Sequence, residues 1–151
     1  MARKTTKKTT TKAESPQEQS THEVLLDDKA SKLSPKHPGF VYFQIGRHLE
    51  KDVLALRLKG NDGGGLHSKE WIPLTSIIAL LEQQEPGKPF KSGLFKAAFV
   101  GGSANNASFL AAVLRSKTIA LLDSSEKSMF LHLLPEDFES RRDVLLALAA
   151  N

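Results

Sequence analysis

The fold is decided by residues 40–59, which read FVYFQIGRHLEKDVLALRLK. Residues 40–45 are β-branched and aromatic, a composition that favours a strand, and the polar stretch after them is typical of a turn. Residues 53–59 predict a second strand, because alternate leucines form one face while Arg57 and Lys59 point to the other. These strands indicate an antiparallel sheet with one apolar face and one polar, basic face.

The residues that follow predict a further strand and then a helix. Residues 60–65, GNDGGG, are a strong turn signal, and residues 66–72 then predict a third strand, which holds the only tryptophan, Trp71. Pro73 suits the first turn of a helix, and residues 74–84 carry apolar side chains at helical spacing. The first half of the chain therefore reads as a sheet followed by a helix.

A similar order is predicted for the second half, where a helix begins at Pro135. The strands expected before it are residues 94–100, 109–117, 118–122 and 128–134, although the alanines of residues 109–117 also permit a helix. Residues 54–59 and 112–117 look alike, since both end in Arg-x-Lys. The two halves are therefore either a duplication or a chance likeness between two apolar strands.

We expect an α+β fold with a tail. The domain spans residues 40–151 and consists of two sheet-then-helix units, βββ(β)α, over residues 40–86 and 90–151. Units of this size are too small to be independently robust, so they are expected to pack together with a pseudo-two-fold axis. Residues 1–39 hold too few apolar side chains to offset the entropy of ordering, which predicts a disordered tail.

The tail carries most of the net charge. The 151 residues have a formal net charge of +4, and residues 1–39 contribute 8 basic and 5 acidic residues, a net +3. A basic arm of this kind contacts phosphates through counterion release, and a solubilising tail is the alternative. The arm residues expected to contact nucleic acid are Arg3, Lys4, Lys7, Lys8 and Lys12.

Composition excludes several classes of protein. The chain has no cysteine, which excludes disulfide scaffolds, thiol enzymes and cysteine-ligated metal sites. Its five histidines show no metal-ligand spacing, and the glycine-rich loop matches no phosphate-binding pattern, so we expect no enzyme, no cofactor and no metal. The absence of a long apolar run and of a visible secretory signal predicts a cytoplasmic protein, associated with the nucleoid if it binds DNA.

The polar face of the expected sheet supplies candidate contacts for a single strand of nucleic acid. Such binders need cations along a groove and flat side chains on which bases stack. The candidate contact residues are Tyr42, Gln44, Arg47, Lys51, Arg57, Lys59, Lys69, Trp71, Lys96, Arg115 and Lys117. Two simpler readings stay open: Arg57 and Lys59 also suit a solvated sheet face, and a tryptophan before a helix also suits a core.

The order of elements over residues 41–81 and 94–149 resembles that of the Whirly, Pur and positive-cofactor-four types of single-stranded nucleic-acid-binding protein. The features that look most like those families are residues 43–46, Arg57 with Lys59, residues 63–65, and Trp71. The Lys-Gly-Lys-Ala-Ala-Leu pattern of plant Whirly proteins is not present, so the resemblance is one of topology. It implies sheets that curve around each other and bind extended single strands with basic and aromatic side chains.

We therefore predict a non-catalytic protein that binds single-stranded DNA, or less readily RNA, through the sheet face and the lysine-rich arm. The alternative is a protein-interaction module that forms a homodimer through the apolar residues 109–122 and 144–150. A regulator of duplex DNA ranks lower, because the first expected helix has no lysine or arginine and the last has only Arg141 and Arg142.

Overall fold

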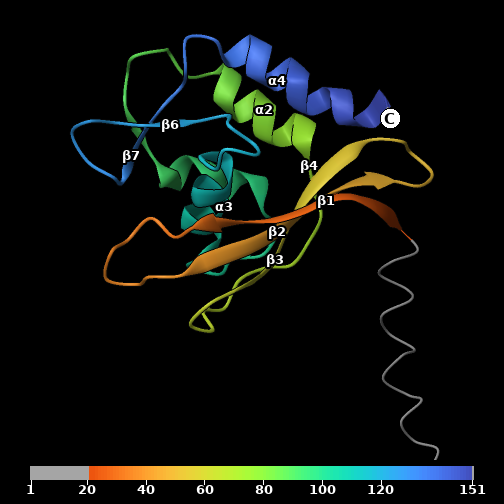
Figure 1. Cartoon of the computed structure of the whole chain (residues 1–151), viewed down its shortest axis with the longest axis horizontal. Helices are drawn as coiled ribbons and strands as arrows, with labels where there is room; N and C mark the ends of the chain where they lie inside the picture. The colour runs from red at the N-terminus through yellow and green to blue at the C-terminus, as the bar shows by residue number, and fades with distance from the viewer. Residues whose placement is uncertain (1–20, 151) are drawn as a thin grey trace, which may run out of the picture.

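The computed structural model describes residues 21–150 and shows an α+β fold with two antiparallel sheets (Figure 1). The larger sheet has the strand order β1-β2-β3-β4, so that strands adjacent in sequence are adjacent in the sheet. Its strands are β1 (His22–Ser31), β2 (Phe40–His48), β3 (Leu54–Asn61) and β4 (Ile72–Pro73). All three pairings are antiparallel, which short connections allow.

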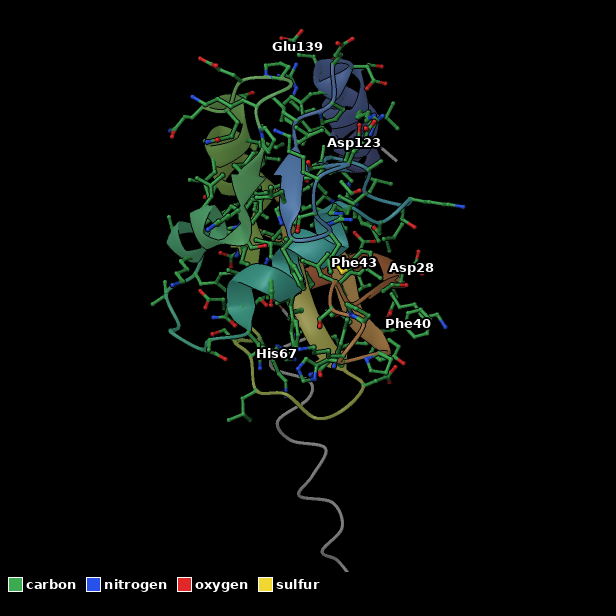
Figure 2. The ribbon with its side chains drawn as sticks, turned by 90° about the vertical axis from the view of Figure 1, so that its left-hand side faces the viewer. Asp28, Phe40, Phe43, His67, Asp123 and Glu139 are labelled. Carbon is green, nitrogen blue, oxygen red and sulfur yellow. The ribbon has the colours of Figure 1, made fainter. Side chains whose placement is uncertain are left out.

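The second sheet is smaller and has the order β5-β7-β6. Its strands are β5 (Phe90–Lys91), β6 (Asp123–Ser124) and β7 (Leu131–Leu133). The helices are α2 (Leu74–Glu82), α3 (Asn106–Leu114) and α4 (Phe138–Leu146), with short 3-10 segments η2 (Ser92–Ala98) and η3 (Ala147–Ala150). Helix α3 lies between the two sheets in both views (Figures 1 and 2).

One face of the larger sheet forms the core. Val41, Phe43 and Ile45 alternate along β2 and are fully buried, as are Leu56 and Leu58 of β3. Each such side chain contributes roughly 1.5–3 kcal/mol when it leaves water, so this face holds the sheet against the helices. Phe43 points into the molecule (Figure 2), and the helices of the described chain all lie on that side (Figure 1). The opposite face is thereby left without a helix over residues 21–150.

The prediction of a disordered tail over residues 1–39 is wrong for residues 22–31, which form the edge strand β1. This strand pairs with β2 along its whole length, from His22 opposite His48 to Ser31 opposite Phe40. It escaped detection because an edge strand buries few side chains, and charged residues on it discourage pairing with other chains. Residues 1–20 of the expected tail lie outside the described residues.

Most strands predicted in the second half are wrong. Residues 109–117 were expected as a strand but lie mostly in α3, and residues 94–100 lie mostly in η2. Eight of the nine residues of α3 are buried, so the helix has no polar face and leaves no helical periodicity in the sequence. Residues 118–122 form no strand in the structure, and the strand expected over 128–134 contracts to β7.

The elements predicted in the first half agree better. Strands β2 and β3 lie where the hairpin was expected, and α2 occupies most of the predicted helix. The third strand expected over residues 66–72 is confined to β4, at its end. Residues 54–59 belong to β3, whereas residues 112–117 begin inside α3, so the similarity of these two segments does not extend to their structure.

Candidate nucleic-acid interface

A row of polar side chains crosses the helix-free face of the larger sheet. The register places Asp27 of β1 opposite Gln44 of β2, and Gln44 opposite Arg57 of β3. Arg57 Nη2 donates to Gln44 Oε1 at 2.8 Å, and Gln44 Nε2 donates to Asp27 Oδ2 at 3.0 Å. Lys59 Nζ donates to Asp27 Oδ1 at 2.9 Å. These four residues, named the polar row below, form one hydrogen-bonded unit across three strands.

Trp71 lies beside the polar row because of its place next to β4. Ile72 pairs with Leu56 and is buried in the core, so the preceding side chain faces the other side of the sheet. There the indole ring sits over Gly46, where an added Cβ would lie 2.8 Å from Trp71 Cη2. The absence of a side chain at Gly46 therefore makes the notch that receives the ring.

Side chains from β1 and β3, the two strands that flank β2, contact the indole ring on this face. The ring of His22, from β1, is stacked on it with 4.3 Å between centroids and 14° between planes. Arg57, from β3, places its Cζ 4.6 Å from the centroid. The ring of His48 meets His22 edge-on at 4.9 Å. We call His22, His48 and Trp71 the aromatic cluster; all three residues are half-buried.

This placement decides how a base could contact the cluster. Trp71 is outside the apolar core, which answers the alternative that it is a core residue. Because His22 and Arg57 contact its ring, a base can reach its open edge or stack on the outer surface of those neighbours. The cluster therefore offers several flat groups side by side.

The charges on this face are partly balanced. The hydrogen bond from Gln44 and the contact with Lys59 keep the pKa of Asp27 below its usual value, so the carboxylate is ionised at neutral pH. Burial lowers the pKa of His22, and the charges of His48 and Arg57 lower it further. Two cations and one carboxylate thus share the polar row, and the imidazole stacked on Trp71 is neutral near pH 7.

Other predicted contact residues lie elsewhere or are engaged. Tyr42 is on the helix-free face, and its hydroxyl donates to Asp62 Oδ1 at 2.9 Å. Arg47 donates to the carbonyl of Ala149 at 2.9 Å and to Glu23 Oε1 at 2.8 Å, which ties β2 to the end of the chain. Arg115 follows α3 and donates to the carbonyl oxygen of Met129 at 2.6 Å. The exposed lysines Lys51, Lys69, Lys96 and Lys117 come from four separate segments.

The structure therefore brings together four of the predicted residues: Gln44, Arg57, Lys59 and Trp71. Three members of the same face are absent from the predicted contact residues: His22 and Asp27, which fall in the expected tail, and His48, at the end of β2. The apolar triplet at residues 24–26 was the available signal for a strand there, but it does not fix the register that brings Asp27 beside Lys59.

A separate polar pair lies inside the molecule. Ser92 Oγ is 2.7 Å from Nε2 of His132, which is fully buried. Burial and the charge of Arg115 lower the pKa of His132 from 6.5 to about 4. A serine beside a histidine is the arrangement found where a hydroxyl is activated as a nucleophile.

The third group of this cluster opposes that chemistry. In a nucleophilic triad a carboxylate accepts a hydrogen bond from Nδ1–H, so that Nε2 is free to take the hydroxyl proton. Here Arg115 Nη1 lies 3.5 Å from His132 Nδ1, and a guanidinium can only donate. That contact favours the tautomer with the proton on Nε2, which then donates to Ser92. The pair therefore links the start of η2 to β7.

Comparison with protein-family models, curated proteins and solved structures finds no match to this chain. Over the described residues, no group of histidine and carboxylate side chains is arranged to hold a metal ion. Nor does any helix between residues 21 and 150 combine the length and apolar character that crossing a membrane requires.

Proposed function

We propose that this protein binds single-stranded nucleic acid, without catalysis, on the helix-free face of the larger sheet. The observation that carries the proposal is the contact between Arg57 of the polar row and Trp71 of the aromatic cluster, on a face that no helix of residues 21–150 covers. A single strand can lay its bases on flat side chains while its phosphates approach cations. A duplex keeps its bases stacked inside, so it gains little from the same surface.

The lysine-rich arm precedes β1, and the first residue of β1 lies on this surface. His22, the first residue of β1, belongs to the aromatic cluster, and Lys12 is ten residues earlier in the sequence. An extended chain covers roughly 3.3–3.6 Å per residue, so Lys12 is within about 35 Å of the cluster. Its lysines and Arg3 can therefore contact phosphates of a strand bound on the face, and this adds affinity without sequence preference.

The resemblance to the Whirly, Pur and positive-cofactor-four types rests on a sheet-then-helix order in both halves, and the order of the first half, β1 to β4 followed by α2, supports the proposal. In that arrangement we assign base contacts to the aromatic cluster, with Trp71 reached at its edge, and phosphate contacts to Arg57 and Lys59. Asp27 competes with phosphate for Lys59 and holds the lysine in place before the strand arrives.

The homodimer alternative draws less support from the structure. Residues 109–122, which were to form its interface, include Phe109, Leu110, Leu114 and Leu122, all buried within the chain's own core. Side chains used in that way are not available to a second copy. In the other predicted segment, residues 144–150, Val144 is the one large apolar side chain that is exposed; Leu145 is buried, and Leu146 and Leu148 are half-buried.

Fluorescence anisotropy tests the proposal with a labelled single-stranded DNA, its duplex and an RNA of the same sequence over a salt series. We expect the single strands to bind more tightly than the duplex, and DNA more tightly than RNA. Lys59→Gln should lower the slope of log affinity against log salt by about 0.7, the value of one phosphate contact on a single strand. Lys88→Gln, in the exposed loop after α2, is the matched control and should leave the slope unchanged.

Deleting residues 1–12 separates the arm from the face. A modest loss of affinity that keeps the preference for single strands is expected if the face is the main binding surface. The proposal would be overturned if single strands and duplex bound equally, if this binding disappeared with the arm, and if Lys59→Gln left it unchanged. The absence of binding at low salt would overturn it as well.

A further inference from the structure

A groove of about 980 Å³ lies apart from the polar row and the aromatic cluster. Its walls come from residues 32–38 between β1 and β2, the glycine loop after β3, the start of η2, the first turn of α3, and the loop before β7. The β1–β2 loop and the β6–β7 loop project on the same side of the molecule (Figure 1). The volume is in the range of sites that enclose small organic ligands.

The charged residues of the groove are all basic. These are Lys32, Lys36 and Lys91, the imidazole of His37 also lines the groove, and none of the described residues that line it is acidic. Residues 21–150 contain 16 basic and 15 acidic residues, so this is a local excess on a nearly neutral domain. A hollow lined by one sign of charge concentrates the opposite charge, which favours an anionic ligand.

The groove also offers flat apolar surface. The side chain of Phe130 is 50% exposed although it is large and aromatic. Phe109 forms part of the floor, with Lys32 Nζ 5.4 Å from its ring centroid. Lys32 Nζ also donates to Asn61 Oδ1 at 2.9 Å and to the backbone carbonyl of Asp62, so this cation is held in place. An aromatic ring of the ligand can stack on Phe130 while its anionic part stays near the lysines.

We propose that this groove binds a nucleoside phosphate, with the base against Phe130 and the phosphate near Lys36 and Lys91. Inorganic phosphate would satisfy the lysines but leave Phe130 uncovered, and an apolar peptide would leave the lysines without a partner. The ligand is either a free nucleotide or the phosphorylated end of a nucleic-acid strand. Because the groove shares no residue with the polar row, the proposal does not depend on the function of the helix-free face.

Isothermal titration calorimetry of the full-length protein with AMP, ATP and tripolyphosphate tests the free-nucleotide source. A 5′-phosphorylated single strand, compared with the same strand bearing a 5′-hydroxyl, tests the strand end. We expect Phe130→Ala to weaken the bound ligand on the order of tenfold, from the loss of one stacking contact. Lys36→Gln with Lys91→Gln should have an effect of at least that size. Lys88→Gln is the control that lies outside the groove.

The outcomes separate clearly. Binding of AMP or ATP that depends on Phe130 and the two lysines supports a free nucleotide. A gain in affinity from the 5′-phosphate that disappears in the same variants supports a strand end. Tripolyphosphate binding as tightly as ATP, or no effect of these variants on any probe, would overturn the proposal. Binding of the 5′-hydroxyl strand, and its response to Lys59→Gln, reports on the helix-free face alone.

Discussion

Replacing His132 with leucine should remove most of the dependence of stability on pH between 6.5 and about 4. His132 is fully buried, and burial is the main reason that its pKa falls from 6.5 to about 4 in the folded protein. Between these values the unfolded chain binds a proton that the folded protein excludes. Above pH 6.5 the burial of His132 therefore costs no proton, and the free energy of unfolding has its full value with respect to this residue. That free energy declines as the pH falls toward the folded pKa.

The size of the effect follows from the two pKa values. A shift from 6.5 to about 4 corresponds to about 3 kcal/mol in the free energy of unfolding. Near neutral pH the leucine variant loses the hydrogen bond between His132 and Ser92, a cost of about 1 kcal/mol. The wild-type protein should therefore be more stable at neutral pH and less stable at about pH 4, and the two curves should cross near pH ~6.

Urea unfolding followed by far-ultraviolet circular dichroism measures this at a series of pH values. Carboxylates such as Asp27 and Asp62, whose pKa values are also lowered, contribute equally to both proteins and cancel in the difference. Ser92→Ala is the matched control, since it removes the same hydrogen bond but leaves the histidine buried, and it should keep the wild-type slope. A leucine variant with the wild-type slope would refute the assignment of the pH dependence to His132.

Two further predictions concern the helix-free face. Asp27→Asn removes the carboxylate of the polar row, so single-strand affinity should rise about threefold, with a steeper salt slope. Glu85→Gln makes the same charge change in an exposed loop and should have no effect. Equal gains in both variants would contradict the placement of the binding surface at the polar row. Gly46→Ala puts a methyl group 2.8 Å from Trp71 Cη2, so the ring must move, the emission of this single tryptophan should shift, and single-strand affinity should fall. Gly60→Ala, where an added Cβ meets nothing within 4 Å, should leave both unchanged; an unshifted emission in Gly46→Ala would mean that the notch does not hold the ring.

The first half of the fold was predictable because its pattern is local. Alternation along residues 54–59 is enough to place Leu56 in the core and Arg57 outside, and the structure confirms both. Helix α3 was not predictable in the same way, since a helix buried on all sides carries the same continuous apolar run as a buried strand. What distinguishes the two is the packing around α3, which depends on residues far away in the sequence.

The candidate site was likewise predictable where its pattern is local, and not where it depends on residues far away in the sequence. Period-two alternation was sufficient to put Gln44, Arg57 and Lys59 on one surface. The ion pair between Lys59 and Asp27 depends on the register of β1 against β2. The two residues are 32 positions apart in the sequence, and the register is set by backbone pairing, which no single side chain specifies. The contact between Trp71 and His22 depends on the same register.

Strand β1 also determines where the domain can be cut. A truncated protein beginning at residue 40, the boundary that composition alone suggests, would lose a strand that pairs with all of β2. Its first residues would be FVYFQI, an uncharged β-prone segment whose backbone amides and carbonyls would stand unpaired at a new edge. Such edges recruit strands from other molecules and lead to insoluble aggregates. By pairing with β2, the charged strand β1 prevents the edge of β2 from pairing with other molecules. A truncated form of the protein should therefore begin no later than Thr21.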